Sequence, residues 1–437
     1  MSIALVTALI IIALLALIVV GTPLGIATLL VSVVTSLIYF GPPGLLLISS
    51  NVYHVLENYS LVAVPLFVFM AGILERSGIA ESLFDAMSTL GGRFPGSLGI
   101  QTCVVAVFLA AMSGIMGGEI VMLGMVALPQ MLRLGYDRKL SIGIICASGA
   151  LATLIPPSIV MIVYGVTANV SISDLFLGGT VPGLLLATIY IGYIYTRCRI
   201  NPAMAPVPVL LEGAVKVQKL KALKDLIAPI FVITSVMGTI YSGMASVTEA
   251  AAIGACAAIL VALLRGRLNY GMIRDTFRQT VLTVGSVIWL VLGAVSLVGI
   301  YNIIGGSKFL HGILAGLGWH PILIILLMMG IVFLLGTFME WIAIVFITVP
   351  IFAPVVVSLG YDPIWFGVLF AMNIQIYYLS PPFGPACFFL KSVAPPDISL
   401  QEIFSSVWPF VLMQFAGLLL VLFFPQLALF LPEVLSR

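Results

Sequence analysis

Two proline pairs lie at the same distance from a Gly-Tyr-Asp turn in two distant parts of the chain. Gly135–Asp137 precedes Pro156–Pro157, with 21 residues from the glycine to the first proline. Gly360–Asp362 precedes Pro381–Pro382 at the same spacing of 21 residues. Proline removes a backbone donor and clashes with the preceding helical turn, so each pair predicts an interrupted helix. The carbonyl groups released there can bind a cation or a ligand.

Two stretches rich in glycine and hydroxyl residues interrupt two other apolar segments. Ser113–Glu119 divides Ser97–Leu134, and Gly336–Glu340 divides Pro321–Leu359, into halves of roughly 16 residues. A crossing needs about 20 residues, so each segment predicts a hairpin that enters and leaves on one side. Helix N-termini favour anions and C-termini favour cations. Two hairpin tips that meet two interrupted helices predict a central site with cation positions beside it.

Residues for enzyme chemistry are not arranged in any familiar pattern. Five cysteines are scattered through apolar segments without metal-ligand spacing, and three histidines lie near segment ends. We find no zinc, haem, phosphate-loop or nucleophile-elbow signature, and no convergent catalytic set. The sequence therefore predicts neither an enzyme nor a nucleic-acid-binding protein, and no cofactor apart from a coupling ion.

The composition places these residues in a membrane. The chain has 437 residues, of which 62% are hydrophobic and 8% are charged, whereas soluble domains are about 45–50% apolar and about 25% charged. The first charged side chain is Glu57. Met1–Val20 lacks the basic start of a signal peptide, so we expect a retained crossing. The uncharged region before Glu57 is expected to be covered by protein as well as lipid.

Basic loops set the expected orientation. Arg197–Lys224 and Arg265–Arg278 carry most of the lysine and arginine, which marks the cytoplasmic side. Two expected crossings separate these loops, so both lie on one side. Arg133, Arg138 and Lys139 fall on that side as well if Ser97–Leu134 is a hairpin, and the N-terminus then lies outside. Full crossings are expected to start near Ile3, Pro23, Ser60, Leu140, Ser171, Leu226, Val247, Thr280, Pro363 and Phe404.

A shift of 225 residues aligns the two halves of the chain. Eight of 29 positions between Pro129 and Pro157 match, including the Gly-Tyr-Asp turn and the proline pair. The copies start on opposite sides of the membrane, which predicts inverted-topology repeats, the architecture of many secondary transporters. A single proline pair could be a packing kink in a membrane helix. Two matched pairs in inverted copies favour a transporter.

The predicted fold is an all-α integral membrane protein made of these two repeats. The first repeat is 1–199, with a hairpin at 97–134 and a broken helix at 138–168. A cytoplasmic linker, 200–224, follows. The second repeat is 225–437, with a hairpin at 321–359 and a broken helix at 362–393.

Several stretches resemble the large membrane subunit of the tripartite ATP-independent periplasmic (TRAP) transporters, and they span most of the chain. They are Val64–Gly78, Ser113–Gly143, Leu154–Ile159, Ser246–Ala255, Gly336–Trp341 and, most specifically, Gly360–Pro395. The resemblance implies a sodium-coupled, elevator-type importer of a small organic acid in the bacterial inner membrane. It also implies two partners, a separate four-helix membrane subunit and a periplasmic substrate-binding protein. The first tip departs from the Ser/Ala-rich pattern of many relatives, and Glu340 stands where the family often has Asp.

Together, the breaks, the tips and the resemblance predict two sodium sites and a substrate site. The predicted sodium-binding residues are Ser113, Gly114, Gly149, Leu154, Pro156, Gly336, Thr337, Met339, Asn373 and Pro381. The predicted substrate-binding residues are Gly117, Gly118, Ser158, Thr337, Glu340, Ser380 and Pro382. No Arg or Lys falls at the expected centre, so helix N-termini and hydroxyls must hold a carboxylate.

Some alternatives stay open on the sequence. Glu119 and Glu340 either line the site or complement the helix N-termini that follow the tips. Asp137 and Asp362 are expected to cap helices, and Glu249 is expected to be a carboxylate at a helix N-terminus. Glu75 and Arg76 are expected to be solvated at the inner face. A stand-alone sodium/carboxylate symporter of the same fold, without a binding protein, is the competing function. A channel would need a continuous polar lining, which the tips and breaks do not provide.

Overall fold

The computed structural model describes residues 2–90, 94–114, 117–207, 215–316 and 318–435. Within these ranges the regular structure consists of helices, as expected for the all-α class. Seven of the described helical segments are long and apolar enough to cross a membrane. They are Tyr59–Arg76, Ile172–Ile200, Ala222–Tyr241, Val247–Leu264, Tyr270–Ile303, Trp341–Ser358 and Leu400–Phe423. Other apolar helices are shorter, because turns or interruptions divide the apolar segments.

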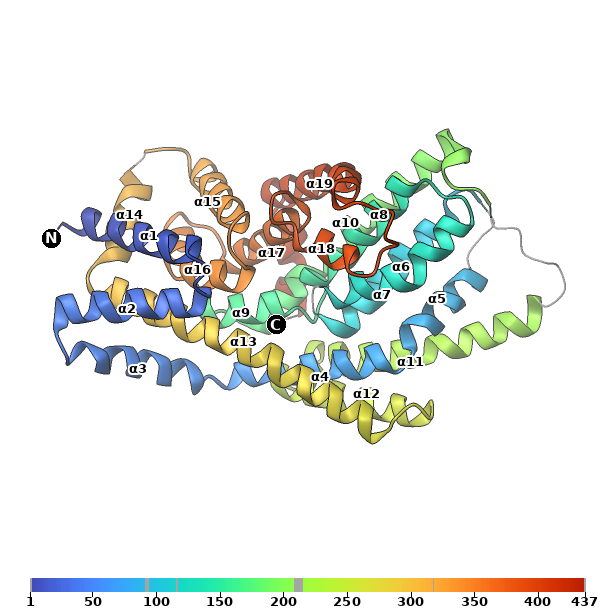
Figure 1. The fold of residues 1–437 in the computed structure, drawn as a ribbon, viewed down its shortest axis with the longest axis horizontal. Helices are drawn as coiled ribbons and strands as arrows, with labels where there is room; N and C mark the ends of the chain where they lie inside the picture. The colour runs from blue at the N-terminus through green and yellow to red at the C-terminus, as the bar shows by residue number, and fades with distance from the viewer. Residues whose placement is uncertain (1, 91–93, 115–116, 208–214, 317, 436–437) are drawn as a thin grey trace.

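The longest of the described helices, α13 (Tyr270–Ile303), runs along one side of the molecule (Figure 1). Its 34 residues correspond to about 50 Å, which exceeds a bilayer core of about 30 Å. It packs against α2 (Leu24–Phe40) and α3 (Gly44–Leu56) toward one end and against α4 (Ala63–Arg76) toward the other. The crossing expected from Thr280 therefore begins ten residues earlier, at a helix start capped by Asn269.

Further helices complete this side of the molecule. α1 (Ile3–Val19) packs on α2, and α12 (Val247–Leu264) packs on α4. α11 (Val215–Tyr241) contacts α12 and α5 (Ile79–Leu90). The part of the expected linker at 208–214 lies outside the described residues, whereas 215–224 form the first turns of α11.

The first expected hairpin corresponds to two helices on either side of the first tip. These are α6 (Ser97–Ser113) and α7 (Gly118–Arg133), which contact each other and α8 (Arg138–Gly149). A short η2 turn (Ala150–Thr153) and the proline pair separate α8 from α9 (Ile159–Ala168). α10 (Ile172–Ile200) follows and contacts α6, α8 and α9.

The second tip lies between α15 (Pro321–Gly336) and α16 (Trp341–Ser358). α16 has 18 residues, slightly more than the expected half-hairpin. α17 (Pro363–Leu379) and α18 (Pro385–Lys391) flank the second proline pair. Several short helices were not predicted separately, among them α3, α5, α14 (Gly306–Gly316) before α15 and α20 (Gln426–Leu435) after α19 (Leu400–Phe423).

The interrupted helices occupy the centre of the molecule. α17 is buried along Trp365–Leu379, and α8 is buried along Leu140–Gly149. α17 contacts η2, α9 and α10, and α19 contacts both α8 and α17. This placement follows from the backbone, because freed carbonyl and amide groups are costly in hydrocarbon unless protein surrounds them.

Candidate functional site

The first interruption is held together by local hydrogen bonds. The Ile155 amide donates to the Leu151 carbonyl at 2.9 Å, and the Ser158 hydroxyl donates to the Thr153 carbonyl at 2.5 Å. Both proline pairs carry a cis bond between the two prolines. The side chains along Ala150–Ser158 are buried, so the surrounding helices enclose the interruption.

The first tip lies directly against this interruption. The Ile159 amide donates to the Gly114 carbonyl at 3.3 Å. Gly114 has φ +59°, and a Cβ there would lie 2.1 Å from the Pro157 carbonyl oxygen. Gly149 approaches the start of α7, where a Cβ would lie 2.5 Å from Ile120 Cγ1. The structure thus brings Ser113, Gly114, Gly149 and Ser158 into one neighbourhood.

The second tip packs on the second interrupted helix. A Cβ on Gly336 would lie 2.3 Å from the Tyr377 ring, and Asn373 Nδ2 donates to the Met329 carbonyl at 2.7 Å. The Thr337 hydroxyl donates to the Leu334 carbonyl at 2.6 Å, which satisfies the end of α15. The Ser380 hydroxyl donates to Ile376 in the same way at 2.8 Å.

A cavity of about 360 Å³ opens beside the first tip. We call it the first-tip cavity. The tip contributes Gly117, Gly118 and Glu119 to its wall, and helices α4, α6, α7, α13 and α18 contribute the other residues. Its other lining residues are Val68, Ala71, Gly72, Glu75, Ser113, Val121, Met122, Gln279, Thr283 and Phe389.

A second cavity of about 380 Å³ lies beside the second tip, and we call it the second-tip cavity. Phe338, Met339 and Glu340 come from the tip, and Trp289 comes from α13. Its remaining lining residues are Ile18, Thr22, Pro23, Leu24, Gly25, Ser286 and Leu290. Gln279, Thr283, Ser286 and Leu290 recur every three or four residues, so one face of α13 passes both cavities.

The acidic residues at the tips line the cavities. Glu119 is wholly buried and accepts a hydrogen bond from the Ser113 hydroxyl. Among the described residues, its Oε2 atom has no hydrogen-bond partner. Glu340 stands at the N-cap position of α16 but makes no capping hydrogen bond with its side chain. Both residues therefore line a cavity, and both also stand at the N-terminus of the helix that follows their tip.

Glu75 and Arg76 lie at the edge of the first-tip cavity. Glu75 is half-buried and lines the cavity, whereas the sequence suggested a solvated residue. The Arg76 guanidinium donates to Gln279 Oε1 at 2.6 Å and to the Gly72 carbonyl at 3.1 Å. Both acceptors belong to residues of the cavity wall, so Arg76 brings a positive charge to its rim.

Most of the chain matches a known family. The family model described as "Tripartite ATP-independent periplasmic transporter, DctM component" matches residues 11–427. The chain belongs to this TRAP transporter family. A sialic acid TRAP transporter large permease of Vibrio cholerae is 30% identical over 423 residues, covering 95% of each chain. A C4-dicarboxylate TRAP transporter large permease of Pseudomonas aeruginosa is 30% identical over 415 residues, covering 92% of each.

One further relative and one solved structure are also similar to the chain. An ectoine/5-hydroxyectoine TRAP transporter large permease of Ruegeria pomeroyi is 31% identical over 381 residues, with 86% of each chain covered. The YdaH transporter of Alcanivorax borkumensis has a similar structure, with a TM-score of 0.64 at 15% identity over 91% of this chain and 95% of that chain. The latter likeness shows the fold alone. The TRAP relatives are transporter permeases and not enzymes, in agreement with the sequence.

Within this TRAP permease, the predicted site residues fall into three groups. Gly117, Gly118 and Ser113 line the first-tip cavity, and Met339 and Glu340 line the second. Residues at the tip–helix contacts include Gly114, Gly149, Ser158, Gly336 and Asn373. The others line neither cavity; they are Leu154, Pro156, Thr337, Ser380, Pro381 and Pro382. The tip residues 115 and 116 lie outside the described part of the chain.

Sequence reasoning missed several polar residues of this TRAP permease. Gln279, Thr283 and Ser286 line the cavities from α13, and their spacing along one helical face was the available signal. Gln375 is wholly buried in α17, and neither of its side-chain amide atoms has a partner among the residues described. An amide in an apolar helix was visible in the sequence, but its burial was not.

Proposed function

We propose that this chain is the large transmembrane subunit of a sodium-coupled, binding-protein-dependent importer of a small organic acid. One observation carries the proposal, the packing of each hairpin tip against an interrupted helix. At the first tip, Gly114 accepts from Ile159 and approaches the Pro157 carbonyl. Carbonyl groups and helix ends assembled in this way are the chemistry of coupling-ion sites in secondary transporters.

Two sodium sites are part of this proposal. The first lies between Ser113–Gly114 and the stretch from Gly149 to Pro156. The second lies between Gly336–Met339 and the stretch from Asn373 to Pro381. Sodium is a hard cation that takes oxygen ligands, and both places bring backbone carbonyls and hydroxyls together. The partial negative charge at the C-terminal ends of α6 and α15 favours a cation there.

We further propose an elevator built from two inverted repeats. The segments 97–168 and 321–393 form the mobile unit, and the remaining helices form the scaffold. The two halves share the matched turns and proline pairs, which supports two exchanged conformations. The cavities lie between the tips and α13, which is where a moving unit would pass a fixed frame.

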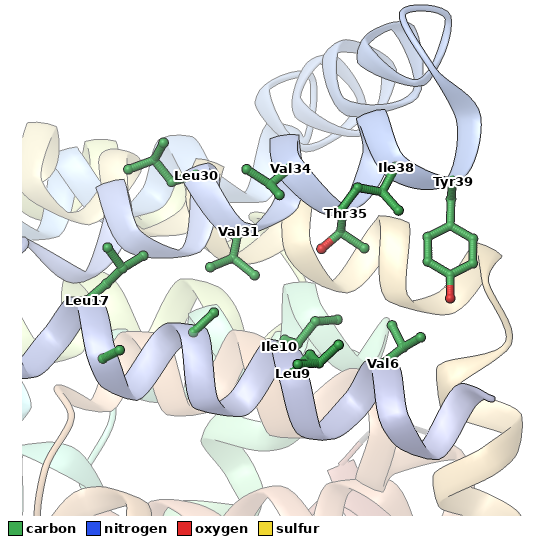
Figure 2. A pocket seen from close by; sticks show the side chains of 12 residues that line it. Val6, Leu9, Ile10, Leu17, Leu30, Val31, Val34, Thr35, Ile38 and Tyr39 are labelled. Carbon is green, nitrogen blue, oxygen red and sulfur yellow. The ribbon is translucent and has the colours of Figure 1, made fainter. Parts of the chain in front are cut away.

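Family membership supports the proposed partners. We propose a separate small membrane subunit, a periplasmic substrate-binding protein and a place in the bacterial inner membrane. An apolar groove of about 480 Å³ runs between α1 and α2, and Figure 2 shows Val6 and Ile10 facing Val31 and Thr35 across it. No charge occurs before Glu57, so this part of the scaffold suits contact with another membrane helix.

Reconstituted import tests the proposed function. The large subunit, its small subunit and the binding protein are placed in proteoliposomes, and import of the bound substrate is followed. We expect import only under an inward sodium gradient and only with all three components. Import that continues in potassium and responds to a protonophore contradicts sodium coupling. Rapid import by the large subunit alone favours the stand-alone symporter.

A further inference from the structure

The first-tip cavity is lined by acidic side chains, which is unusual for a site that receives an organic acid. Two carboxylates line it, Glu75 from α4 and Glu119 from α7, and its described lining residues include no Lys or Arg. Glu119 is wholly buried, and its Oε2 has no partner in the described part of the chain. A buried carboxylate oxygen without a partner is costly, so the cavity is suited to a positively charged group.

The remaining wall groups fit such a ligand. The Phe389 ring lines the cavity and packs on the tip, where a Cβ on Gly117 would lie 2.9 Å from it. An aromatic face beside a carboxylate stabilises ammonium and amidinium groups. Thr283 and Gln279 add hydroxyl and amide groups from α13. The Phe389 ring and the Thr283 hydroxyl oxygen can both face a cationic nitrogen, whereas Gln279 Oε1 already accepts from Arg76.

The rim offers the opposite charge. Arg76 contacts Gln279 and Gly72 of the wall. The N-terminus of α7 begins at Gly118, which also lines the cavity. A carboxylate is favoured near a guanidinium and near a helix N-terminus. The cavity and its rim therefore present negative and positive partners for one small molecule.

We propose that the acid imported by this transporter is a zwitterion, a carboxylate that also carries a positively charged nitrogen, and that Glu119 and Glu75 receive the nitrogen in the first-tip cavity. This inference rests on the proposed import function and names its substrate class. A dicarboxylate would bring its second negative charge toward two carboxylates, and the repulsion of like charges disfavours that binding.

Ligand binding to the purified complex of large and small subunits tests the substrate class. The probes are ectoine and glycine betaine, which are zwitterions, and succinate, which is a dianion, at constant sodium and ionic strength. We expect the zwitterions to raise the melting temperature by about 2 °C or more, since a ligand that binds the native state stabilises it. A shift with succinate alone, or no shift with any probe, overturns the proposal.

Variants that remove one carboxylate charge test where the positively charged nitrogen of the ligand binds. Glu119→Gln and Glu75→Gln should each reduce the zwitterion shift, and Glu119→Asp should retain part of it. Glu57→Gln removes an exposed carboxylate outside both cavities and serves as the matched control. A melting temperature of Glu119→Gln near that of the parent, without ligand, shows that the variant is folded. If Glu119→Gln loses only its response to sodium and keeps the zwitterion shift, Glu119 is a sodium ligand and the proposal is wrong.

Import assays separate this inference from the proposed function. If zwitterions bind but import needs neither the binding protein nor the small subunit, the substrate class stands and the tripartite function fails. If import needs all three components but carries succinate and excludes both zwitterions, the function stands and the substrate class fails.

Discussion

At the scale of single residues, Gly114 is the contact on which the first tip depends. Its φ of +59° lies in the left-handed region, where side chains other than glycine are disfavoured. Its Cα also faces the Pro157 carbonyl, so closely that a Cβ would lie 2.1 Å from that oxygen. The backbone of Pro157 cannot move aside as the end of a flexible side chain can. A methyl group at this position must push the tip away from the interruption.

Gly114→Ala is therefore expected to impair sodium-dependent import at least about tenfold, because about 1.4 kcal/mol suffices for that change. The sodium concentration that gives half-maximal import should rise as well. Gly192→Ala is the matched control, since a Cβ there meets nothing within 4 Å. The amount of protein in the membrane is measured for both variants. An unchanged sodium dependence in folded Gly114→Ala contradicts a sodium site at this contact.

Capping residues show what the sequence could predict at this scale. Asp137 accepts from the Leu140 amide at 2.8 Å, and Asp362 accepts from the Ile364 amide at 2.6 Å, as expected. Glu249 forms a capping box with Ser246, also as expected. Caps involve neighbours within three residues, so local patterns suffice. Glu75 was expected to be solvated because residues that line the cavity with it, such as Gln279 and Ser113, come from distant segments.

At the scale of elements, α13 determines how the cavities are spaced. It approaches α2 through glycines on both helices. A Cβ on Gly293 would lie 2.4 Å from the Gly25 carbonyl, and a Cβ on Gly25 would lie 2.8 Å from Trp289 Cδ1. Small residues permit close helix contacts in membranes, where apolar attraction to lipid is as strong as attraction to protein. This contact holds Trp289 and Ser286 beside the second tip.

Gly293→Ala should separate α2 from α13 and lower the stability of the protein. Overpacking typically costs about 1–3 kcal/mol, so we expect the melting temperature of the purified protein to fall by a few degrees. Gly285→Ala lies in the same helix, and a Cβ there meets nothing within 4 Å. This control should match or exceed the parent. Equal melting temperatures for both variants would contradict a close contact between α2 and α13.

Helix limits were harder to predict than helix positions. The start of α13 at Tyr270 was missed because Arg274 and Arg278 lower the apolar character of its first turns. Long basic side chains can extend toward the membrane surface while their helix continues. The interruptions at Pro156 and Pro381 were visible, because proline acts on its own helical turn. How the helices on either side pack depends on contacts distant in sequence, which no local pattern records.

At the scale of the whole molecule, both cavities lie between a hairpin tip and the same face of α13. The second-tip cavity joins Phe338 of the tip to Thr22 between α1 and α2. α2 and α3 pack on α13 and hold that side of the wall together. If the hairpins move past α13 and its neighbours during transport, the tip residues of each cavity must separate from the scaffold residues that they now face. A covalent cross-link between the tip and the scaffold would then block the transport cycle.

Cysteines at Phe338 and Thr22 test this movement. Phe338 is 65% exposed, and both residues line the second-tip cavity. Cys256 is exposed and is replaced by Ser, whereas Cys103, Cys146, Cys198 and Cys387 are buried and remain. A bifunctional thiol reagent with a reducible spacer should stop import in the double variant, and reduction should restore it. Each single-cysteine variant treated with the same reagent should keep most of its import, because one attached group leaves the hairpin free to move. Import at the parent rate by fully cross-linked protein would show that the second tip does not move past α13 and its neighbours, and a gated site with stationary hairpins would replace the elevator.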